Sequence, residues 1–435
     1  MDTMDYYDGP FDPHFELARL SRSSLARLGR EYMFFNHLHD RSVMPIVLNR
    51  FGMEARTALA VDEWRGSSPV YGRRLRDTLK IKGKGISAIF KTMQNDVGAP
   101  HHFLDFQFEL VNETRGYFWA ERCGPYECVN TASGGDPGLI KELCHDMEDT
   151  TFPSTTMAVN PKAYCLPVHR PPLPAGHSGP PCKWEVSIKD EHQTLRATDI
   201  CRTVALSKAA RFAFPYVPEL LHEGMEDYSG PFKPDYELDD LSHAALVRLC
   251  KEFTLDVHLL IRACMISIAT RWGEATMKEV AREEWLAAAP VYVARIRKTL
   301  RMEGDDLGAI LKMLQVDPAF PHDYVDFGCR LVDARQAYFW INQCAAVSRG
   351  EAGGWLTLLA DAPSPGFEAT LEAVNPRARC RPADPARIGP EASRAVYAWE
   401  ITIDEGAQPR DRSRITQPVW VEQLLGFTHR SPRNG

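Results

Sequence analysis

The triplet Tyr117-Phe118-Trp119 returns as Tyr338-Phe339-Trp340, 221 positions further along the chain. The same offset aligns Gly9-Pro10-Phe11 with Gly230-Pro231-Phe232, and many single residues between these points also agree. Agreement at one register over such a span is very improbable by chance. The sequence therefore predicts an internal repeat, which decides the fold before any single motif does.

The second half of the repeat aligns at a shorter offset of 215 residues, because a deletion of six residues follows Cys344. At this offset Asn160-Pro161 aligns with Asn375-Pro376, and Trp184 aligns with Trp399. The two aligned stretches are called the first copy and the second copy below.

The repeat predicts two homologous domains that pack against each other as an intramolecular pseudo-dimer. We expect the first domain at 10–190 and the second at 230–405. Residues 191–229 then form a linker, and 406–435 form a loosely held tail.

Within one copy, the spacing of apolar residues changes from helical to alternating. Leu25, Leu28 and Tyr32 predict a helix that runs towards Phe51, with a kink or break at Pro45. In the first copy we expect further helices over 54–66, 68–79 and 86–95, strands over 103–110, 117–119, 163–169 and 182–188, and a helical segment over 136–159 divided at Pro153. Each copy is therefore predicted to have a helical N-terminal half followed by a β-β-α-β-β antiparallel sheet, an α+β fold.

Composition narrows the classes of partner. The 435 residues are 44% hydrophobic and 25% charged, with a net charge of −7, so we expect a globular protein with no nucleic-acid partner. The acidic start MDTMDYYDGP does not resemble a secretory signal, and the most apolar stretch carries Arg262 and is too short to span a bilayer. Eleven cysteines without an export signal predict free thiols in the cytoplasm, and no membrane partner is expected.

A set of reactive side chains is present in the first copy only. Asp146 survives in the second copy as Asp361, but its polar neighbours do not. The replacements are Cys144 by Leu359, His145 by Ala360, Glu148 by Pro363, His169 by Asp384 and Cys182 by Tyr397. This pattern is expected when one domain holds a site and the other acts as a scaffold.

Three interpretations of this set remain open. Cys144 or Cys182 is a thiolate nucleophile, with His145 as base and Asp146 orienting it. Alternatively, the two cysteines and His145, with Glu148, bind an ion such as zinc through soft ligands. The third interpretation is an exposed acidic helix with scattered thiols and no shared chemistry.

Several short motifs carry a family resemblance. Arg50-Phe51-Gly52, Asp62-Glu63-Trp64 and Arg122-Cys123, followed by Leu143-Cys144 and Gly179 through Cys182, resemble the L-2-amino-thiazoline-4-carboxylic acid hydrolases and their relatives. That family opens a thiazoline ring. The resemblance implies that Cys123, Cys144, Asp146 and Cys182 occupy positions of reactive polar groups.

From the resemblance and the copy comparison together we expect a hydrolase of a small C–N or C–S compound, centred on cysteine in the first copy. Cys123, Glu148 and His169 are expected to contact the substrate. A zinc-like cofactor is compatible with the metal interpretation and is not required by the thiol interpretation. The alternative function is a non-catalytic protein that binds a small molecule or a metal ion.

Overall fold

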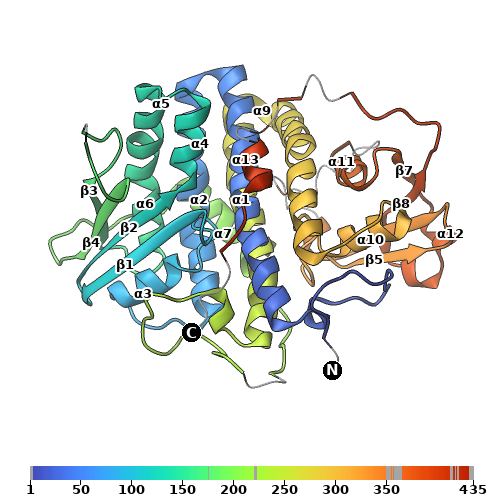
Figure 1. The fold of residues 1–435 in the computed structure, drawn as a ribbon, viewed down its shortest axis with the longest axis horizontal. Coiled ribbons are helices and arrows are strands. Elements are labelled where there is room, and N and C mark those ends of the chain that lie inside the picture. The colour runs from blue at the N-terminus through green and yellow to red at the C-terminus, as the bar shows by residue number, and fades with distance from the viewer. Residues whose placement is uncertain are drawn as a thin grey trace.

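Two four-stranded antiparallel sheets flank a central group of long helices, so the protein has an α+β architecture (Figure 1). The structure is a computed structural model. It describes residues 3–174, 176–219, 223–348, 354, 356, 365–411, 415–416, 418 and 421–430. The long helices are α1 (Arg22–Phe51), α2 (Met53–Thr78) and α9 (His243–Leu300). Buried side chains from both copies form one continuous core around them.

The long helices follow the repeat closely. The α1 helix begins after Ser21, whose side chain accepts a hydrogen bond from the Ser24 N–H, and Gly52 with φ of 87° separates α1 from α2. The equivalent glycine, Gly273, has φ of 88° and divides α9 into two helical parts at a kink. Both positions need a positive φ, which glycine adopts without strain.

Two predicted helix breaks at prolines are wrong. Pro45 lies inside the continuous α1, and Pro69 lies inside α2, so the separate helices expected over 54–66 and 68–79 are one helix. The Ser68 hydroxyl donates to the Trp64 carbonyl one turn back, as it does inside a continuous helix. Tertiary packing overrides the local preference here: Ile46, for example, is completely buried beside Pro45.

The sheet prediction for the first copy is confirmed. Strands β1 (Leu104–Asn112), β2 (Arg115–Cys123), β3 (Ala163–His169) and β4 (Cys182–Ile188) form a sheet in the order β1-β2-β4-β3. Strands β5 (Phe327–Leu331), β6 (Ala337–Asn342), β7 (Ala378–Pro382) and β8 (Ala395–Ile403) form the second sheet in the matching order β5-β6-β8-β7. Phe118 pairs with Trp184, and Phe339 pairs with Trp399, so the register agrees as well.

The segment between the two strand pairs of the first sheet differs from its prediction. It consists of α4 (Gly124–Ala132), α5 (Pro137–Lys141), the π-helical turn η2 (Glu142–Met147) and α6 (Glu148–Met157). The irregularity therefore falls at η2, and Pro153 lies inside α6. Single π turns inside helices are frequent at functional sites. The aligned part of the second copy, residues 358–363, lies outside the described residues.

The remaining elements are short. The helices are α3 (Ile86–Met93), α7 (Asp199–Leu206), α8 (Lys208–Arg211), α10 (Leu307–Gln315), α11 (Pro365–Val374), α12 (Pro385–Ile388) and α13 (Val421–Gly426), and the single 3₁₀ turns are η1 (Leu17–Arg19), η3 (Leu238–Asp240), η4 (Ala345–Val347) and η6 (Pro390–Ala392). The short helices α7 and α8 lie in the predicted linker. Part of the predicted tail is ordered as α13, which packs against α9.

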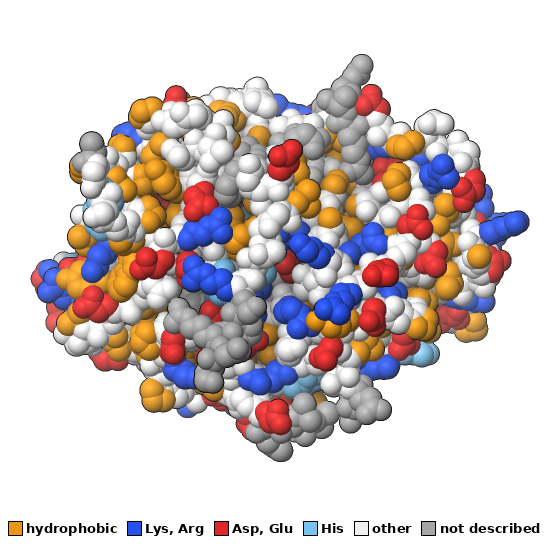
Figure 2. Space-filling view, viewed as in Figure 1, with side chains coloured by type: hydrophobic (Ala, Val, Ile, Leu, Met, Phe, Trp, Pro, Cys, Tyr) orange, Lys and Arg blue, Asp and Glu red, His pale blue; other side chains and the backbone are white. Residues whose placement is uncertain are grey.

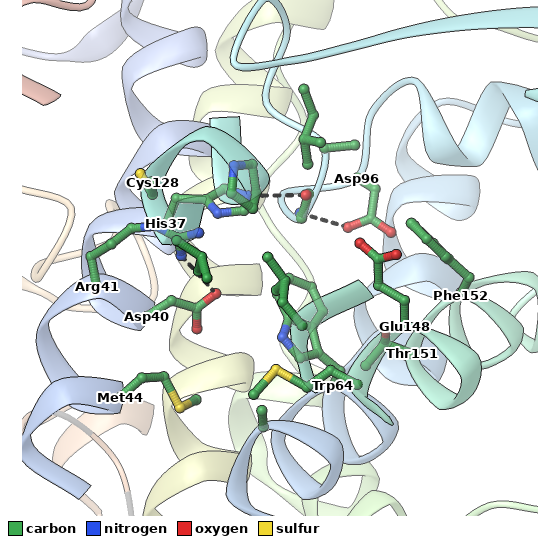
Figure 3. Close-up of a pocket in the computed structure, with 18 of the residues that line it drawn as sticks. His37, Asp40, Arg41, Met44, Trp64, Asp96, Cys128, Glu148, Thr151 and Phe152 are labelled. Atoms are coloured by element: carbon green, nitrogen blue, oxygen red, sulfur yellow. Dashed lines mark hydrogen bonds and ion pairs between the residues drawn. The ribbon is translucent and has the colours of Figure 1, made fainter. Parts of the chain in front are cut away.

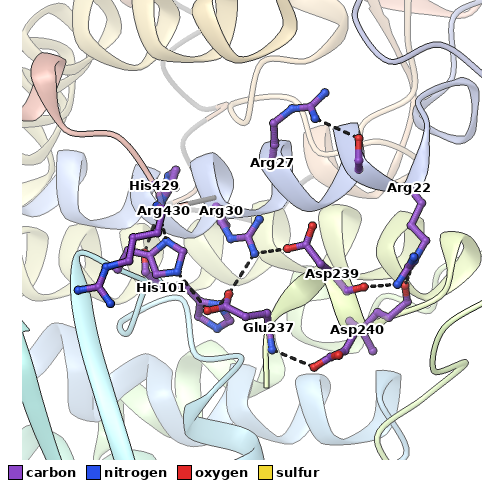
Figure 4. Close-up of polar contacts among 12 residues, drawn as sticks. Arg22, Arg27, Arg30, His101, Glu237, Asp239, Asp240, His429 and Arg430 are labelled. Carbon is purple, nitrogen blue, oxygen red and sulfur yellow. Dashed lines mark hydrogen bonds and ion pairs between the residues drawn. The ribbon is translucent and has the colours of Figure 1, made fainter. Parts of the chain in front are cut away.

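The N-terminal arm of each copy packs on the other copy. The Tyr7 hydroxyl donates to Gln315 Oε1 at 2.8 Å, and the Tyr228 hydroxyl donates to Gln94 Oε1 at 3.0 Å. The two hydrogen bonds are related by the 221-residue offset. In the second arm, Glu237 also contacts His101 (Figure 4).

Two buried ion pairs between the copies are reciprocal in the same way. Arg295 Nε lies 2.8 Å from Glu31 Oε2, and Arg74 Nε lies 2.5 Å from Glu252 Oε1. The partners at equivalent positions exchange between the copies, as they do across the twofold axis of a homodimer.

The most apolar helix is buried, and the surface carries both acidic and basic side chains. The α9 helix is apolar and long enough to cross a membrane, but 83% of its most apolar stretch is buried inside the protein, as in a core helix. Acidic and basic side chains alternate over the face shown in Figure 2. All eleven cysteines are free.

Candidate functional site

A cavity of about 190 Å³ lies in the first copy between the long helices and the η2–α6 segment. Its apolar wall includes Met44 and Trp64 from the long helices and Phe152 from α6. Polar side chains enter from several elements (Figure 3): His37, Asp40 and Arg41 from α1, Arg56 from α2, Asp96 from the loop after α3, and Glu148 from α6. A mostly apolar space with a few convergent polar groups is typical of a ligand site.

The orientation of one tryptophan distinguishes the copies. Trp64 rests against Gly98, where an added Cβ would lie 2.5 Å from Trp64 Cζ3. The equivalent Trp285 rests instead against Gly366, where a Cβ would lie 2.4 Å from Cε3, and its Nε1–H reaches Tyr292 Oη at 3.2 Å. Trp64 therefore forms a wall of the cavity, whereas Trp285 is completely buried in the core.

The residues around the tryptophan also differ between the two copies. Gly98 is replaced by Ala319 in the second copy, and Ala99 by Phe320. The Phe320 ring is buried and packs against Phe367 at a centroid distance of 6.1 Å. Ala99 has no ring and lines the cavity of the first copy, so the space that the Phe320 ring takes in the second copy is available to the cavity.

Glu148 is the carboxyl group that the sequence prediction and the cavity share. It begins α6, is half-buried, and its carboxylate points into the cavity in Figure 3. Burial raises the pKa of Glu148 to about 8, although Arg170 opposes this shift. A carboxyl group with such a pKa holds its proton at neutral pH and can donate it.

Asp40 enters the cavity from α1, on a different wall from Glu148 (Figure 3). Its carboxylate Oδ2 lies 3.7 Å from Arg41 Nη1. Burial and the neighbouring Glu63 raise the pKa of Asp40 to about 7. The second copy has Ile261 at this position, so this acid is specific to the first copy.

Asp96 belongs to a hydrogen-bond network that both copies share. It accepts from the Tyr71 hydroxyl at 2.8 Å and from the Gly98 N–H at 2.7 Å. In the second copy, Asp317 contacts Tyr292 in the same way. Burial raises the pKa of Asp96 to about 6 and that of Asp317 to about 7. The shared network holds the loop and is not specific to the cavity.

Two arginines and a histidine complete the polar lining. Arg56 is held by Glu142 of η2, with 3.0 Å between Nε and Oε1, and Met277 replaces it in the second copy. His37 donates from Nε2 to the Gly98 carbonyl at 3.0 Å. Burial and the charge of Arg41 lower the pKa of His37 to about 3, so its imidazole is neutral. Arg41 and Arg56 are the arginines of the lining, and each lies beside an acidic partner, Asp40 and Glu142.

The predicted thiols converge near Glu148, outside the cavity lining. Cys123, Cys144 and Cys182 are buried, and Glu148 acts electrostatically on all three. Cys165 of β3 joins this group. Burial is the largest cause of a raised pKa in each: it brings Cys182 to about 12 and holds the other three well above the ordinary value. Buried neutral thiols of this kind are poor nucleophiles.

The other predicted site residues, His145, His169 and Asp146, have partners other than these thiols. His145 Nε2 lies 2.8 Å from the Pro171 carbonyl oxygen, and His169 Nε2 lies 3.1 Å from that of Pro180. Asp146 is exposed and pairs with Lys141 at 3.0 Å, so its carboxylate does not orient His145. The predicted relay of Cys144, His145 and Asp146 is therefore not assembled in this structure.

The sequence prediction missed Asp40, Arg56 and Trp64 as site residues. The signal for the first two was present, because the copy comparison replaces them with Ile261 and Met277. Trp64 is shared by both copies, so only its orientation reveals its role.

Comparison of the chain with known protein families, curated proteins and solved structures found no match.

Proposed function

We propose that the first copy is the active unit of an enzyme that hydrolyses a small C–N or C–S compound in its cavity. The observation that carries the proposal is Glu148, a carboxyl group that faces an apolar cavity and is absent from the second copy. Groups that titrate near neutrality in a cavity are the usual acids and bases of enzymes. Here a carboxyl group replaces the cysteine nucleophile that the sequence favoured.

The reaction divides between two carboxyl groups. Glu148 gives its proton to the nitrogen or sulfur that leaves, while Asp40 accepts a proton from the water that attacks carbon. The water oxygen forms the new bond to carbon as the C–N or C–S bond breaks, so one proton is donated and one is accepted. Arg41 and Arg56 stabilise the negative charge that develops or that the substrate carries.

The cavity volume limits the size of the substrate. An engineered protein cavity of about 150 Å³ binds benzene. A cavity of about 190 Å³ therefore accommodates a molecule with one small ring. The two arginines favour a substrate with a carboxylate, which is the chemistry of a thiazoline carboxylate.

The two copies have different roles in this proposal. We infer that the chain arose by duplication of one α+β domain and that the second copy became a scaffold, with Trp285 and Phe320 filling the space that is open in the first. The reciprocal pairs Arg295–Glu31 and Arg74–Glu252 support a pseudo-dimer. Free buried thiols support a cytoplasmic location.

The proposal is tested with L-2-amino-thiazoline-4-carboxylate and a panel of related small rings. Substrate loss is followed by liquid chromatography and mass spectrometry. We expect Glu148→Gln to lower turnover about 10²–10⁴-fold, because it keeps the shape of the side chain and removes its proton transfer. Glu109→Gln, at an exposed position of β1, is the matched control and should not change turnover.

The same experiment distinguishes the hydrolase from the alternative, a non-catalytic binding protein. Ligand-dependent thermal stabilisation without turnover would favour a non-catalytic small-molecule binding protein. If no compound in the panel binds or is consumed, the proposal of a hydrolase is overturned.

A further inference from the structure

Three buried side chains meet between the copies, behind the cavity wall. His39 comes from α1, Glu63 from α2 and Cys264 from α9, and each is at most 1% exposed. One potential ligand atom from each lies within 4.8 Å of the others. Within the described part of the chain, this is the one group of His, Cys, Asp and Glu side chains that converges in this way.

Three polar atoms of this group, His39 Nε2 and both carboxylate oxygens of Glu63, make no hydrogen bond with the described residues. His39 Nε2 and Glu63 Oε1 lie 3.0 Å apart, at ion-pair distance but without hydrogen-bond geometry. Neither oxygen of Glu63 has a hydrogen bond within the described residues. Buried polar atoms without partners are rare and costly, so several at one point require an explanation.

The other ring nitrogen of His39 is already engaged. His39 Nδ1 makes a hydrogen bond with Glu284 Oε1 on α9. Histidines that bind metals commonly donate their second N–H to a carboxylate, which fixes the tautomer and directs the free nitrogen at the ion. The contact with Glu284 has this arrangement and leaves Nε2 for a ligand.

We propose that His39 Nε2, the Glu63 carboxylate and the Cys264 thiolate bind one divalent metal ion of the zinc class. Zinc accepts nitrogen, oxygen and sulfur donors together, with bonds of about 2.0–2.3 Å. Two anionic ligands neutralise the dication, which removes the cost of burying their charges alone. A metal ion also deprotonates the thiol that binds it.

The site belongs to the assembled pair of copies. His39 and Glu63 come from the first copy, and Cys264 comes from the second. Glu284 is the counterpart of Glu63, but Leu260 and Val43 replace the counterparts of His39 and Cys264. The chain therefore offers one such site, and the metal links the two copies at their interface.

The site adjoins the cavity at Asp40 and Trp64, which follow the proposed ligands His39 and Glu63 in the sequence. Asp40 follows His39 on α1, interacts with Glu63 and lines the cavity. Three protein ligands leave a fourth tetrahedral position for a water molecule or another group. The inference goes beyond the proposed hydrolase, because the metal site is defined by residues outside the cavity lining.

The experiment uses the full-length protein, stripped with a chelator and then dialysed against Zn²⁺ alone. Inductively coupled plasma mass spectrometry should give one zinc ion per chain. Cys264→Ser and Glu63→Gln should each weaken zinc affinity at least tenfold, and Glu284→Gln should weaken it about 10–100-fold. Cys250→Ser is the matched control, because Cys250 is also buried on α9 and should leave zinc content unchanged.

A second measurement does not depend on the folding of variants. With Co²⁺ in place of zinc, the unmodified protein should show a thiolate-to-cobalt charge-transfer band in the near ultraviolet. Absence of both this band and stoichiometric zinc would overturn the proposal, as would full zinc retention by folded Cys264→Ser and Glu63→Gln. Glu148→Gln should keep its metal, so failure of the hydrolase proposal is distinguishable from failure of this one.

Discussion

Trp64 and Gly98 are in direct contact, and an added Cβ at residue 98 would lie 2.5 Å from Trp64 Cζ3. Real Cβ atoms essentially never approach so closely, so any larger residue at 98 must displace the indole. The second copy has Ala319 at this position, and its tryptophan takes the other orientation. The contact with Gly98 therefore leaves no room for a Cβ beside the orientation that Trp64 takes in the cavity wall.

We expect Gly98→Ala to move Trp64 and reduce the cavity. The substitution should cost about 1–3 kcal/mol of unfolding free energy through overpacking, and ligand-dependent thermal stabilisation should be lost. Urea unfolding and thermal shifts with the thiazoline carboxylate measure the two effects. Gly426→Ala is a suitable control, because no atom lies within 4 Å of its added Cβ. Unchanged ligand binding in Gly98→Ala would show that the contact does not hold the cavity open.

The pH dependence of stability provides a test of Glu148 that needs no substrate. Its folded-state pKa is raised from 4.5 to about 8, so between these values the folded protein holds a proton that the unfolded chain has released. This group therefore makes the unfolding free energy fall as pH rises, by up to about 1.4 kcal/mol per pH unit. Glu148→Gln should remove this contribution.

The comparison is made by urea unfolding at several values between pH 5 and pH 9. Glu148→Gln should gain stability relative to the unmodified protein up to about pH 8 and keep a constant difference above it. A difference that does not vary with pH would mean that Glu148 has an ordinary pKa. Glu109→Gln, at an exposed position of β1, serves as the control.

The cysteines of the first copy should be structural. Because Cys144 and Cys182 are buried and their pKa values are raised, we expect Cys144→Ser and Cys182→Ser to retain turnover when folded. Alkylation of the native protein at neutral pH, followed by peptide mass spectrometry, should modify the half-buried Cys344 first. Loss of turnover in both folded serine variants would restore the thiol mechanism.

The sequence predicted the sheets well because their signal is local. The alternation in 163–169 and 182–188 coincides with β3 and β4 in the structure. Helix continuity at Pro45 was mispredicted, because proline lowers helix propensity locally while burial against α9 acts at long range.

The cavity was harder to predict than the elements that form it. Glu148 was found because the second copy lacks it, and Asp40 was available by the same comparison. In each copy the tryptophan packs against a glycine, but the glycine is at a different position. Trp64 packs against Gly98, which is Ala319 in the second copy, and Trp285 packs against Gly366, which is Thr151 in the first copy. Such a choice arises from packing in three dimensions and has no periodicity along the chain.

The interface between the copies should depend strongly on Arg295. Its guanidinium contacts Glu31 through two nitrogens, and both side chains are less than 10% exposed. It also donates to the Leu424 and Phe427 carbonyls, which holds α13 in place. Removing one partner of a buried ion pair typically costs about 3–5 kcal/mol, because the other charge stays buried and unpaired. We expect Arg295→Met to lower the unfolding free energy by this amount.

Urea unfolding measures the effect, and two further variants make it specific. Arg74→Met should behave similarly, since Arg74 pairs with Glu252 at the equivalent position. Arg377→Met removes the exposed pair with Glu405 and should cost at most about 1 kcal/mol. If Arg295→Met were no more destabilising than Arg377→Met, the reciprocal pairs would not hold the copies together, and apolar packing of α1 against α9 would have to do so alone.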